Sequence, residues 1–546
     1  MAQEYKVKGL ASLDLKSGEK REVELEGIEN GKVLLARVGD KTHALSSNCT
    51  HYGAPMKLGV LTPDGRLTCA WHGACFNVAS GDVEDAPALD PLAKFDIVEK
   101  NGGVYVKGDE KTIKASRRQS NTKCASQGQE KVVVVGGGSG AMGAVQALRE
   151  QGFKGAVTMI SSEPNVPIDR TKLSKALIAD ASKIALRTED WFKSSSVEQI
   201  SDEVSSVDFE KKSVSTTSGS SYPYTKLILA SGGTPKALPL PGFKDLSNIF
   251  LLRTIPDVQA ILSAVGEEKG KKIVVVGSSF IGMEVSNALA SNNDVTVIGM
   301  ESAPLERVMG AEVGKIFQSL ISKNGVKFHM SASVDSAHPS SDKTRVGSVK
   351  LKDGTSLPAD LVILGIGVAP ATGYLKDNPA VKLQNDGSLL TSESFAVKGL
   401  DDVYAIGDIA SYPYHGPGGS GAVTRIEHWN VAQNAGRSVA RSIVSPSSPP
   451  KPFIPIFWSA LGSQLRYCGN TPNGWDQLVL QGQPEEGKFA AFYGKEGVVV
   501  AVASMMMDPV MTQSAELMRR GRMPGVKELE GGLDVKDVQL PVEVKM

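Results

Sequence analysis

Two cysteine–histidine boxes near the N-terminus carry side chains that bind transition metals. The first box, CTHYGA, offers Cys49 and His51, and the second, CAWHGACF, offers Cys69 and His72. Zinc, haem iron and iron–sulfur clusters all use such ligands. Structural zinc commonly takes both cysteines from one box, whereas each box here holds one cysteine and one histidine. That order favours a 2Fe–2S cluster with two cysteines on one iron and two histidines on the other. Zinc, or four unrelated residues, is the alternative.

A glycine-rich turn further along has the spacing that binds the pyrophosphate of a dinucleotide. In VVVVGGGSGAMG, Gly136 follows a run of valines, and Gly138 and Ala141 open an apolar helical segment. The first glycine makes the turn, the second lets the backbone approach a pyrophosphate, and the third position needs only a small residue. Glu163, about twenty residues further on, is the candidate acceptor for a ribose hydroxyl, and a solvated loop acid is the alternative.

A second turn, GSSFIG, repeats the pattern with one departure. Gly277 and Gly282 keep the outer positions, but Ser279 stands at the middle position, where a Cβ atom crowds a pyrophosphate. Glu301 follows the strand-like DVTVIG and is placed to accept a hydrogen bond from an adenosine ribose. A carboxylate there would repel a 2′-phosphate, so the sequence favours NADH over NADPH.

Elements of two kinds must position these groups. The N-terminal part reads as short strands and hairpins, with turns at Gly39-Asp40 and Pro63-Asp64-Gly65. From Lys131 the pattern becomes strand, glycine turn and helix, twice. The last part combines a hairpin, KFAAFYGKEGVVVAVAS, with a helix near MTQSAELMRRG. We predict a multidomain chain with a β-rich domain over 1–108, a linker over 109–129, a dinucleotide-binding α/β domain over 130–255 and 376–446, a second over 256–375, and a small α+β domain over 450–546.

Composition narrows the class of protein. The chain has 546 residues, and its 60 basic and 60 acidic residues cancel, so neither nucleic acid nor an anionic membrane is an expected partner. No apolar run reaches the roughly 18 residues that cross a bilayer. The N-terminus has no signal-peptide or presequence pattern. Five cysteines, an odd number, argue against a secreted disulfide framework. We therefore predict a soluble, cytoplasmic protein and leave association with mitochondria open.

The cysteine–histidine boxes closely resemble those of Rieske domains. The resemblance implies four cluster ligands: Cys49, His51, Cys69 and His72. Respiratory Rieske proteins carry a further cysteine in each box, where this chain has Ala54 and Trp71, and a serine and a tyrosine where it has Ala74 and Phe76. Fewer hydrogen bonds to the cluster sulfurs imply a potential near the low end of the Rieske range. The segment is thus similar to soluble Rieske-type ferredoxins, and Cys75 is expected to be a core residue.

Six short motifs resemble, in their order, flavoenzymes related to the disulfide reductases. They are GGGSGAMG, PIDRTKLSK, LILASGGTP, GSSFIGMEV, LGIGVAP and VYAIGDIA. The resemblance implies that Arg170, Ala230 and Asp408 contact FAD, and that Gly367 closes the NAD domain. No cysteine lies between Cys124 and Cys468, so the active-site disulfide of many such enzymes is absent from the sequence.

Further segments resemble one branch of the FAD-dependent pyridine nucleotide oxidoreductases, the apoptosis-inducing factor-like proteins that contain a Rieske domain. GSSFIGMEV, EHWNVAQNAG and FWSALGSQLRYCGN carry this resemblance, which spans nearly the whole chain. It implies that Lys175 lies beside the flavin and pairs with Glu284, both as catalytic residues. It also implies that His428 and Trp429 line the flavin.

The resemblance implies an NAD(P)H oxidoreductase with FAD and a Rieske 2Fe–2S cluster. Electrons would pass from NADH through FAD to the cluster and on to an unknown one-electron acceptor. One alternative is a redox-sensing or signalling protein of the apoptosis-inducing factor type. Another is the reductase component of an oxygenase system with its ferredoxin built in. The acceptor and the oligomeric state stay open.

Overall fold

The computed structural model describes residues 3–542. The N-terminal domain is built from two antiparallel sheets. The larger has the order β1-β10-β9-β4-β3-β2, and its strands are β1 (Gln3–Lys6), β2 (Lys20–Glu24), β3 (Lys32–Val38), β4 (Lys41–Ser46), β9 (Lys94–Lys100) and β10 (Gly103–Gly108). The smaller comprises β5 (Val60–Leu61), β6 (Arg66–Thr68), β7 (Cys75–Asn77) and β8 (Val83–Asp85). Both predicted hairpin turns are confirmed, between β3 and β4 and between β5 and β6.

The segment predicted to be a linker begins with a short helix, α1 (Glu110–Ala115). The side chain of Asp109 caps this helix by accepting from the backbone of Thr112, and Ile113 is buried. A cap and one apolar residue are enough to fix about one turn against a neighbouring sheet. From residue 116 to β11 the chain has no helix or strand. Because the segment is polar overall, its composition gave no indication that Ile113 would be buried.

The first α/β unit has a five-stranded parallel sheet in the order β13-β12-β11-β17-β29. These strands are β11 (Lys131–Val135), β12 (Ala156–Ser161), β13 (Val197–Ser201), β17 (Lys226–Leu229) and β29 (Val403–Ala405). Helices α2 (Ser139–Glu150) and α8 (Trp429–Val444) pack together in close contact. A Cβ atom on Gly143 would lie 2.4 Å from the Gln433 carbonyl oxygen, and one on Gly436 would lie 2.3 Å from that of Gly140. Glycine is therefore what lets the two backbones touch.

The second α/β unit repeats the design with the order β19-β26-β20-β21-β22. Its elements are β19 (Ile249–Phe250), α5 (Ile255–Val265), β20 (Lys272–Val276), α6 (Phe280–Leu289), β21 (Asp294–Ile298), α7 (Glu306–Ser322), β22 (Lys327–His329) and β26 (Leu361–Leu364). Strand β19 falls inside the range predicted for the first unit but pairs with β26 of the second. The other domain bounds stay predictions.

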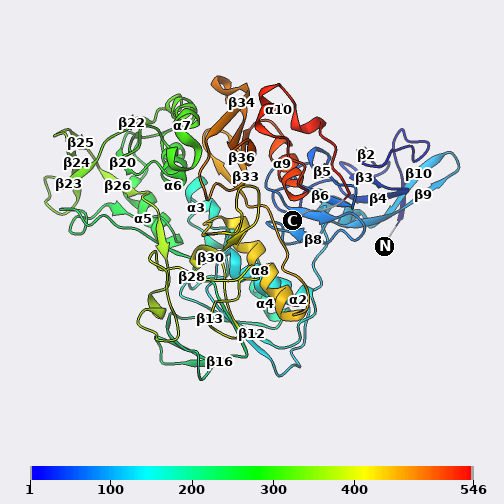
Figure 1. The fold of residues 1–546 in the computed structure, drawn as a ribbon, viewed down its shortest axis with the longest axis horizontal. Coiled ribbons are helices and arrows are strands. Elements are labelled where there is room, and N and C mark those ends of the chain that lie inside the picture. The colour runs from blue at the N-terminus through cyan, green and yellow to red at the C-terminus, as the bar shows by residue number, and fades with distance from the viewer. Residues whose placement is uncertain (1–2, 543–546) are drawn as a thin grey trace.

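The C-terminal domain is an antiparallel sheet covered by helices, in the order β32-β33-β36-β35-β34. Its elements are β32 (Ile456–Ala460), β33 (Gln464–Gly469), β34 (Gln477–Gln483), β35 (Lys488–Lys495), β36 (Val498–Met505), α9 (Val510–Arg519) and α10 (Val526–Glu530). The predicted hairpin and helix are confirmed as β35–β36 and α9. In Figure 1 this domain lies between the blue N-terminal domain and the green second α/β unit.

The remaining elements are short. They are α3 (Thr171–Lys175), α4 (Glu189–Ser194), β14 (Val204–Asp208), β15 (Ser213–Thr216), β16 (Ser221–Pro223), β18 (Gly233–Pro235), β23 (Val334–Pro339), β24 (Val346–Leu351), β25 (Ser356–Pro358), β27 (Val368–Pro370), β28 (Leu389–Leu390), β30 (Ala410–Tyr414) and β31 (Ala422–Thr424). Among the helices of residues 3–542, none is both long and apolar enough to cross a membrane.

Candidate redox site

A cavity, here called the first cavity, opens at the carboxyl ends of β11, β17 and β29, where doubly wound sheets bind their ligands. These strand ends contribute Gly138, Ala230 and Asp408, while α3 and α6 contribute Lys175 and Glu284. Aromatic side chains complete the wall: His428, Trp429, Phe457 and Trp458. Residues predicted from separate motifs to bind FAD therefore meet at one place.

The turn from β11 to α2 has the shape that a pyrophosphate requires. Gly136 has a φ of 122°, and a Cβ atom on it would lie 2.2 Å from the Ala230 carbonyl oxygen. Gly138 precedes α2 without any side-chain cap, and a Cβ on it would meet open space. The first N–H groups of α2 are thus free to bind an anion. Ala141 is buried within the helix, and together these residues fit the pyrophosphate of FAD.

Two acidic residues predicted to bind FAD are held by arginines. Glu163 pairs with Arg170 at 2.5 Å, and Arg170 also donates to the carbonyl oxygen of Arg253 at 2.7 Å. Arg253 pairs in turn with Asp408 at 3.0 Å. Arg170 and Asp408 line the first cavity, and Glu163 lies behind Arg170. A contact between Glu163 and the FAD ribose stays a prediction.

Lys175 and Glu284 form an ion pair at the wall of the first cavity. The Lys175 Nζ atom lies 2.9 Å from Glu284 Oε1, and the Glu284 side chain is only 4% exposed. Two hydroxyls also donate to this carboxylate, from Ser174 and from Ser459, each at 2.5 Å. A buried carboxylate is tolerated when it is paired and hydrogen-bonded in this way. Glu284 therefore ties α3, α6 and β32 together around the lysine.

His428 supplies a further test of whether the first cavity suits a polar cofactor. Burial lowers the pKa of this imidazole to about 4, so the ring is neutral at pH 7. Its Nδ1 atom is buried and has no hydrogen-bond partner among residues 3–542. Buried polar atoms are nearly always satisfied. A polar ligand in the first cavity is the simplest partner for this nitrogen, which agrees with FAD.

A second cavity lies at the β20–α6 turn and includes Gly277, Ser279, Glu301 and Gly367 in its wall. The Ser279 hydroxyl donates to the Gly365 carbonyl oxygen at 2.7 Å and caps α6 by accepting from Gly282 at 3.5 Å. The side chain thus turns toward its own backbone. Gly282 is buried within α6. These positions are compatible with a nicotinamide dinucleotide, and their contacts with it stay predictions.

Glu301 does not stand alone in the second cavity, because its Oε1 atom lies 2.6 Å from Arg307 Nε. The Arg307 side chain is 78% exposed and could attract a 2′-phosphate that Glu301 repels. The sequence alone gave no sign of this pairing. The predicted preference for NADH is therefore opposed by a neighbouring cation.

We expect NADH to bleach the flavin faster than NADPH in stopped-flow experiments, with opposite responses in two variants. Glu301→Ala should narrow the difference and Arg307→Ala should widen it, because each removes one charge near the ribose. A charge at about 4 Å in water is worth about 1 kcal/mol, which is about fivefold in rate. Equal rates for both coenzymes in all three proteins would show that neither residue contacts the ribose.

The two cysteine–histidine boxes form two loops with the same backbone pattern. Cys49 N donates to Ala54 O and Cys69 N donates to Ala74 O, each at 2.8 Å. Gly53 and Gly73 close the loops at φ values of 78° and 73°. The loops, residues 49–54 and 69–74, are named the first and the second cluster loop.

The four predicted ligands face one another in two pairs. The thiols of Cys49 and Cys69 face each other and are buried. The Nδ1 atoms of His51 and His72 lie 3.1 Å apart, and burial lowers the pKa of His51 to about 4 and that of His72 well below its usual value. Neutral imidazoles are the form that binds metal.

The pairing of the side chains agrees with one of the candidate metal groups. A Rieske 2Fe–2S cluster takes two cysteines on one iron and two histidines on the other. Here the two thiols face each other, and so do the two imidazoles. The four residues therefore fit the Rieske cluster. Cys75 is buried in β7, as expected.

Trp458 joins the first cavity to the cluster loops. Its side chain lines the first cavity, and its ring centroid lies 4.5 Å from that of His72 and 5.6 Å from that of His51. In the sequence, FWSALG carries a family resemblance, but it predicts no role for Trp458 or Ser459. A tryptophan and a serine flanked by apolar residues are typical of many buried strands, so the local sequence does not indicate that these two residues border a redox site.

Family models match the chain in three consecutive parts. The model described as pyridine nucleotide-disulphide oxidoreductase matches residues 130–436. The Rieske 2Fe-2S domain matches residues 5–96, and the reductase C-terminal model matches residues 456–536.

Individual proteins match over most of the chain. Apoptosis-inducing factor 3 of Mus musculus is 35% identical over 526 residues, which is 95% of this chain and 84% of that protein. The ferredoxin–NAD(+) reductase subunit of the benzene 1,2-dioxygenase system of Pseudomonas putida is 27% identical over 68% of this chain and 88% of its own. Among solved structures, the covalent putidaredoxin reductase–putidaredoxin complex matches with a TM-score of 0.69 and 27% identity, covering 75% of this chain and 98% of that one.

Proposed function

Because the chain belongs to the pyridine nucleotide-disulphide oxidoreductase family and carries a Rieske domain, we propose that it transfers electrons from NADH through FAD to its own 2Fe–2S cluster. An external one-electron acceptor would then re-oxidise the cluster. FAD can accept a hydride and release single electrons, and the cluster accepts one electron at a time.

The residues of the first cavity each support one part of this proposal. The cationic Lys175 would favour negative charge on the bound ring, and Glu284 would hold the lysine in place. Arg170 and the N-terminus of α2 would bind the FAD phosphates. Phe457 and Trp458 would exclude water from one side of the cavity.

One observation carries the proposal: Trp458 borders both the first cavity and the histidines of the cluster loops. Its side chain is 6% exposed, so the space between the two sites is filled by protein. The indole Nε1 atom has no hydrogen-bond partner among the described residues. A single aromatic ring thus separates the place for FAD from the place for the cluster.

Trp458→Leu should slow the arrival of electrons at the cluster far more than it changes the reduction of flavin by NADH. Loss of close packing between reacting groups costs roughly tenfold to a hundredfold in rate. An anaerobic NADH titration, followed by flavin absorbance and by the electron-spin signal of the reduced cluster, separates the two steps. Reduced flavin beside a persistently oxidised cluster in the unmodified protein would instead indicate a sensor.

A further inference from the structure

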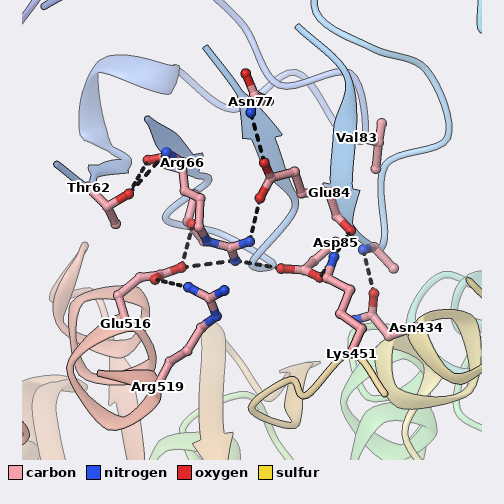
Figure 2. A network of polar contacts seen from close by, with 12 residues as sticks. Thr62, Arg66, Asn77, Val83, Glu84, Asp85, Asn434, Lys451, Glu516 and Arg519 are labelled. Carbon is pink, nitrogen blue, oxygen red and sulfur yellow. Dashed lines mark hydrogen bonds and ion pairs between the residues drawn. The ribbon is translucent and has the colours of Figure 1, made fainter. Parts of the chain in front are cut away.

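The Rieske domain is fastened to the rest of the protein by buried charges. Arg66 in β6 pairs with Asp85 of its own domain at 2.5 Å and with Glu516 of α9 at 3.3 Å (Figure 2). Lys451, from the segment before β32, pairs with Asp85 at 2.7 Å (Figure 2). The Arg66 and Glu516 side chains are 6% and 4% exposed. Release of the domain would have to separate all these groups together.

Hydrogen bonds to α8 and a further ion pair at the end of α9 add to this attachment. The amide of Asn430 in α8 donates to the Ala86 carbonyl oxygen at 2.8 Å, and Asn434 accepts from the Ala86 N–H at 2.9 Å. Asp64 pairs with the fully buried Arg520 at 2.5 Å. The Rieske domain is therefore held by α8, by α9 and by the segment before β32.

The two cluster loops differ in what surrounds them although their backbones are alike. The second loop is covered: His72 is 6% exposed and packs on Trp458, and the Trp71 carbonyl oxygen accepts from Arg466 at 3.2 Å. A Cβ atom on Gly73 would lie 2.5 Å from Ile456 Cδ1. The first loop is covered only in part: Tyr52 donates to Asp169 and lies beneath Lys172, whereas His51 is half-buried and Gly53 is exposed. One histidine faces inward and the other is nearer to solvent.

Two exposed cations are linked to the first loop by sequence or by hydrogen bonding, and their carboxylate partners are more buried than they are. Lys57 pairs with Glu22 at 2.8 Å, with side-chain exposures of 47% and 12%. Arg117 pairs with Asp90 at 3.3 Å, with exposures of 48% and 11%. The Asp90 carbonyl oxygen accepts from Thr50 within the loop at 2.5 Å. In these two pairs the cation is therefore the more exposed partner, and it is the charge that an approaching molecule would meet first.

From these contacts we propose that electrons enter the cluster on the His72 side and leave on the His51 side, to an acceptor protein whose docking face is acidic. The acceptor binds over the first cluster loop while the Rieske domain stays docked. This inference rests on the proposed function, because it takes a cluster reduced through FAD as its starting point. Each transfer moves one electron from the reduced cluster to the acceptor.

Permanent docking is tested by joining the Rieske domain to the C-terminal domain. In a Cys124→Ser background, Pro63→Cys and Arg522→Cys are linked with a flexible bismaleimide, because both positions are exposed and each adjoins the Asp64–Arg520 pair, which stays intact. The linked protein should re-oxidise with ferricyanide at the rate of the unlinked protein. A soluble dysprosium chelate should also relax the spin of the reduced cluster equally in both. Loss of re-oxidation and of relaxation on linking, with cluster reduction by NADH retained, would show that the domain must undock.

The exit surface is tested with two small acceptors of opposite charge. Lys57→Glu with Arg117→Glu should lower the rate with anionic ferricyanide about tenfold and raise the rate with cationic hexaammineruthenium(III). The control, Lys193→Glu with Lys211→Glu, makes the same charge change at side chains 75% and 82% exposed in the first α/β unit. If both double variants changed the rates with the two acceptors equally, the proposal that electrons leave at the first cluster loop would be wrong. A cluster that NADH fails to reduce in the unmodified protein would instead refute the proposed function.

Discussion

Cys69→Ser is expected to remove the iron–sulfur cluster while FAD stays bound. Cys69 is buried in the second cluster loop opposite Cys49, and a serine hydroxyl is a poor replacement for a thiolate on iron. FAD is predicted to bind in the first cavity, whose pyrophosphate turn belongs to a different domain. Iron and sulfide should fall to background, flavin absorbance should persist, and transfer to one-electron acceptors should be lost.

A matched control is offered by Cys75, six residues away in β7. This thiol is also buried, but it lies outside both cluster loops. Cys75→Ala should keep iron and sulfide at the amounts of the unmodified protein. If Cys69→Ser retained its iron, or if metal analysis of the unmodified protein returned zinc, the assignment of the four ligands would be wrong.

Lys175→Met should slow the reduction of flavin by NADH roughly a hundredfold, because a single preorganised charged donor at a reacting centre typically contributes that much. The variant also leaves Glu284 as a buried carboxylate that keeps two serine hydroxyls but loses its counter-charge. Such a carboxylate is costly, and the melting temperature should fall with the rate. Stopped-flow absorbance and thermal unfolding measure the two effects.

Lys172→Met provides the comparison within the same helix. The Lys172 Nζ atom lies 3.9 Å from the ring centroid of Tyr52 in the Rieske domain. This variant should reduce its flavin at nearly the normal rate. Adding Glu284→Gln to Lys175→Met should restore the melting temperature, because no buried charge is then left unpaired, but it should not restore the rate of flavin reduction. That result would separate the contribution of the pair to stability from its part in the reaction. A normal rate in Lys175→Met alone would remove Lys175 from the site.

The features that could be predicted from the sequence are those encoded within a few residues. The grouping of the predicted cluster ligands follows from two short boxes, since a loop of six residues fixes its own cysteine and histidine. The turn at Gly136 follows from steric demands that glycine alone meets. The β3–β4 and β35–β36 hairpins follow from alternation around a turn. Each of these needs no knowledge of distant contacts.

The features that were missed depend on residues far apart in the chain. Trp458 and His72 come from different domains, and so do Ser459 and Glu284. The pairing of Glu301 with Arg307 is closer in sequence but depends on how the loop before α7 folds. Helix α1 forms because Ile113 finds a buried place. Each of these contacts depends on tertiary packing, which cannot be inferred from the local composition of the sequence.

The tether between β10 and β11 has a kinetic consequence. A ferredoxin and a reductase made as separate chains must meet by diffusion, so their transfer rate depends on concentration and on salt. A tether of this length holds its domain at an effective concentration on the order of millimolar. The step between the two redox sites is then independent of dilution. Even at a low concentration of this protein, transfer from FAD to the cluster would keep its rate within every molecule. Only the transfer from the cluster to the acceptor would depend on the concentration of acceptor.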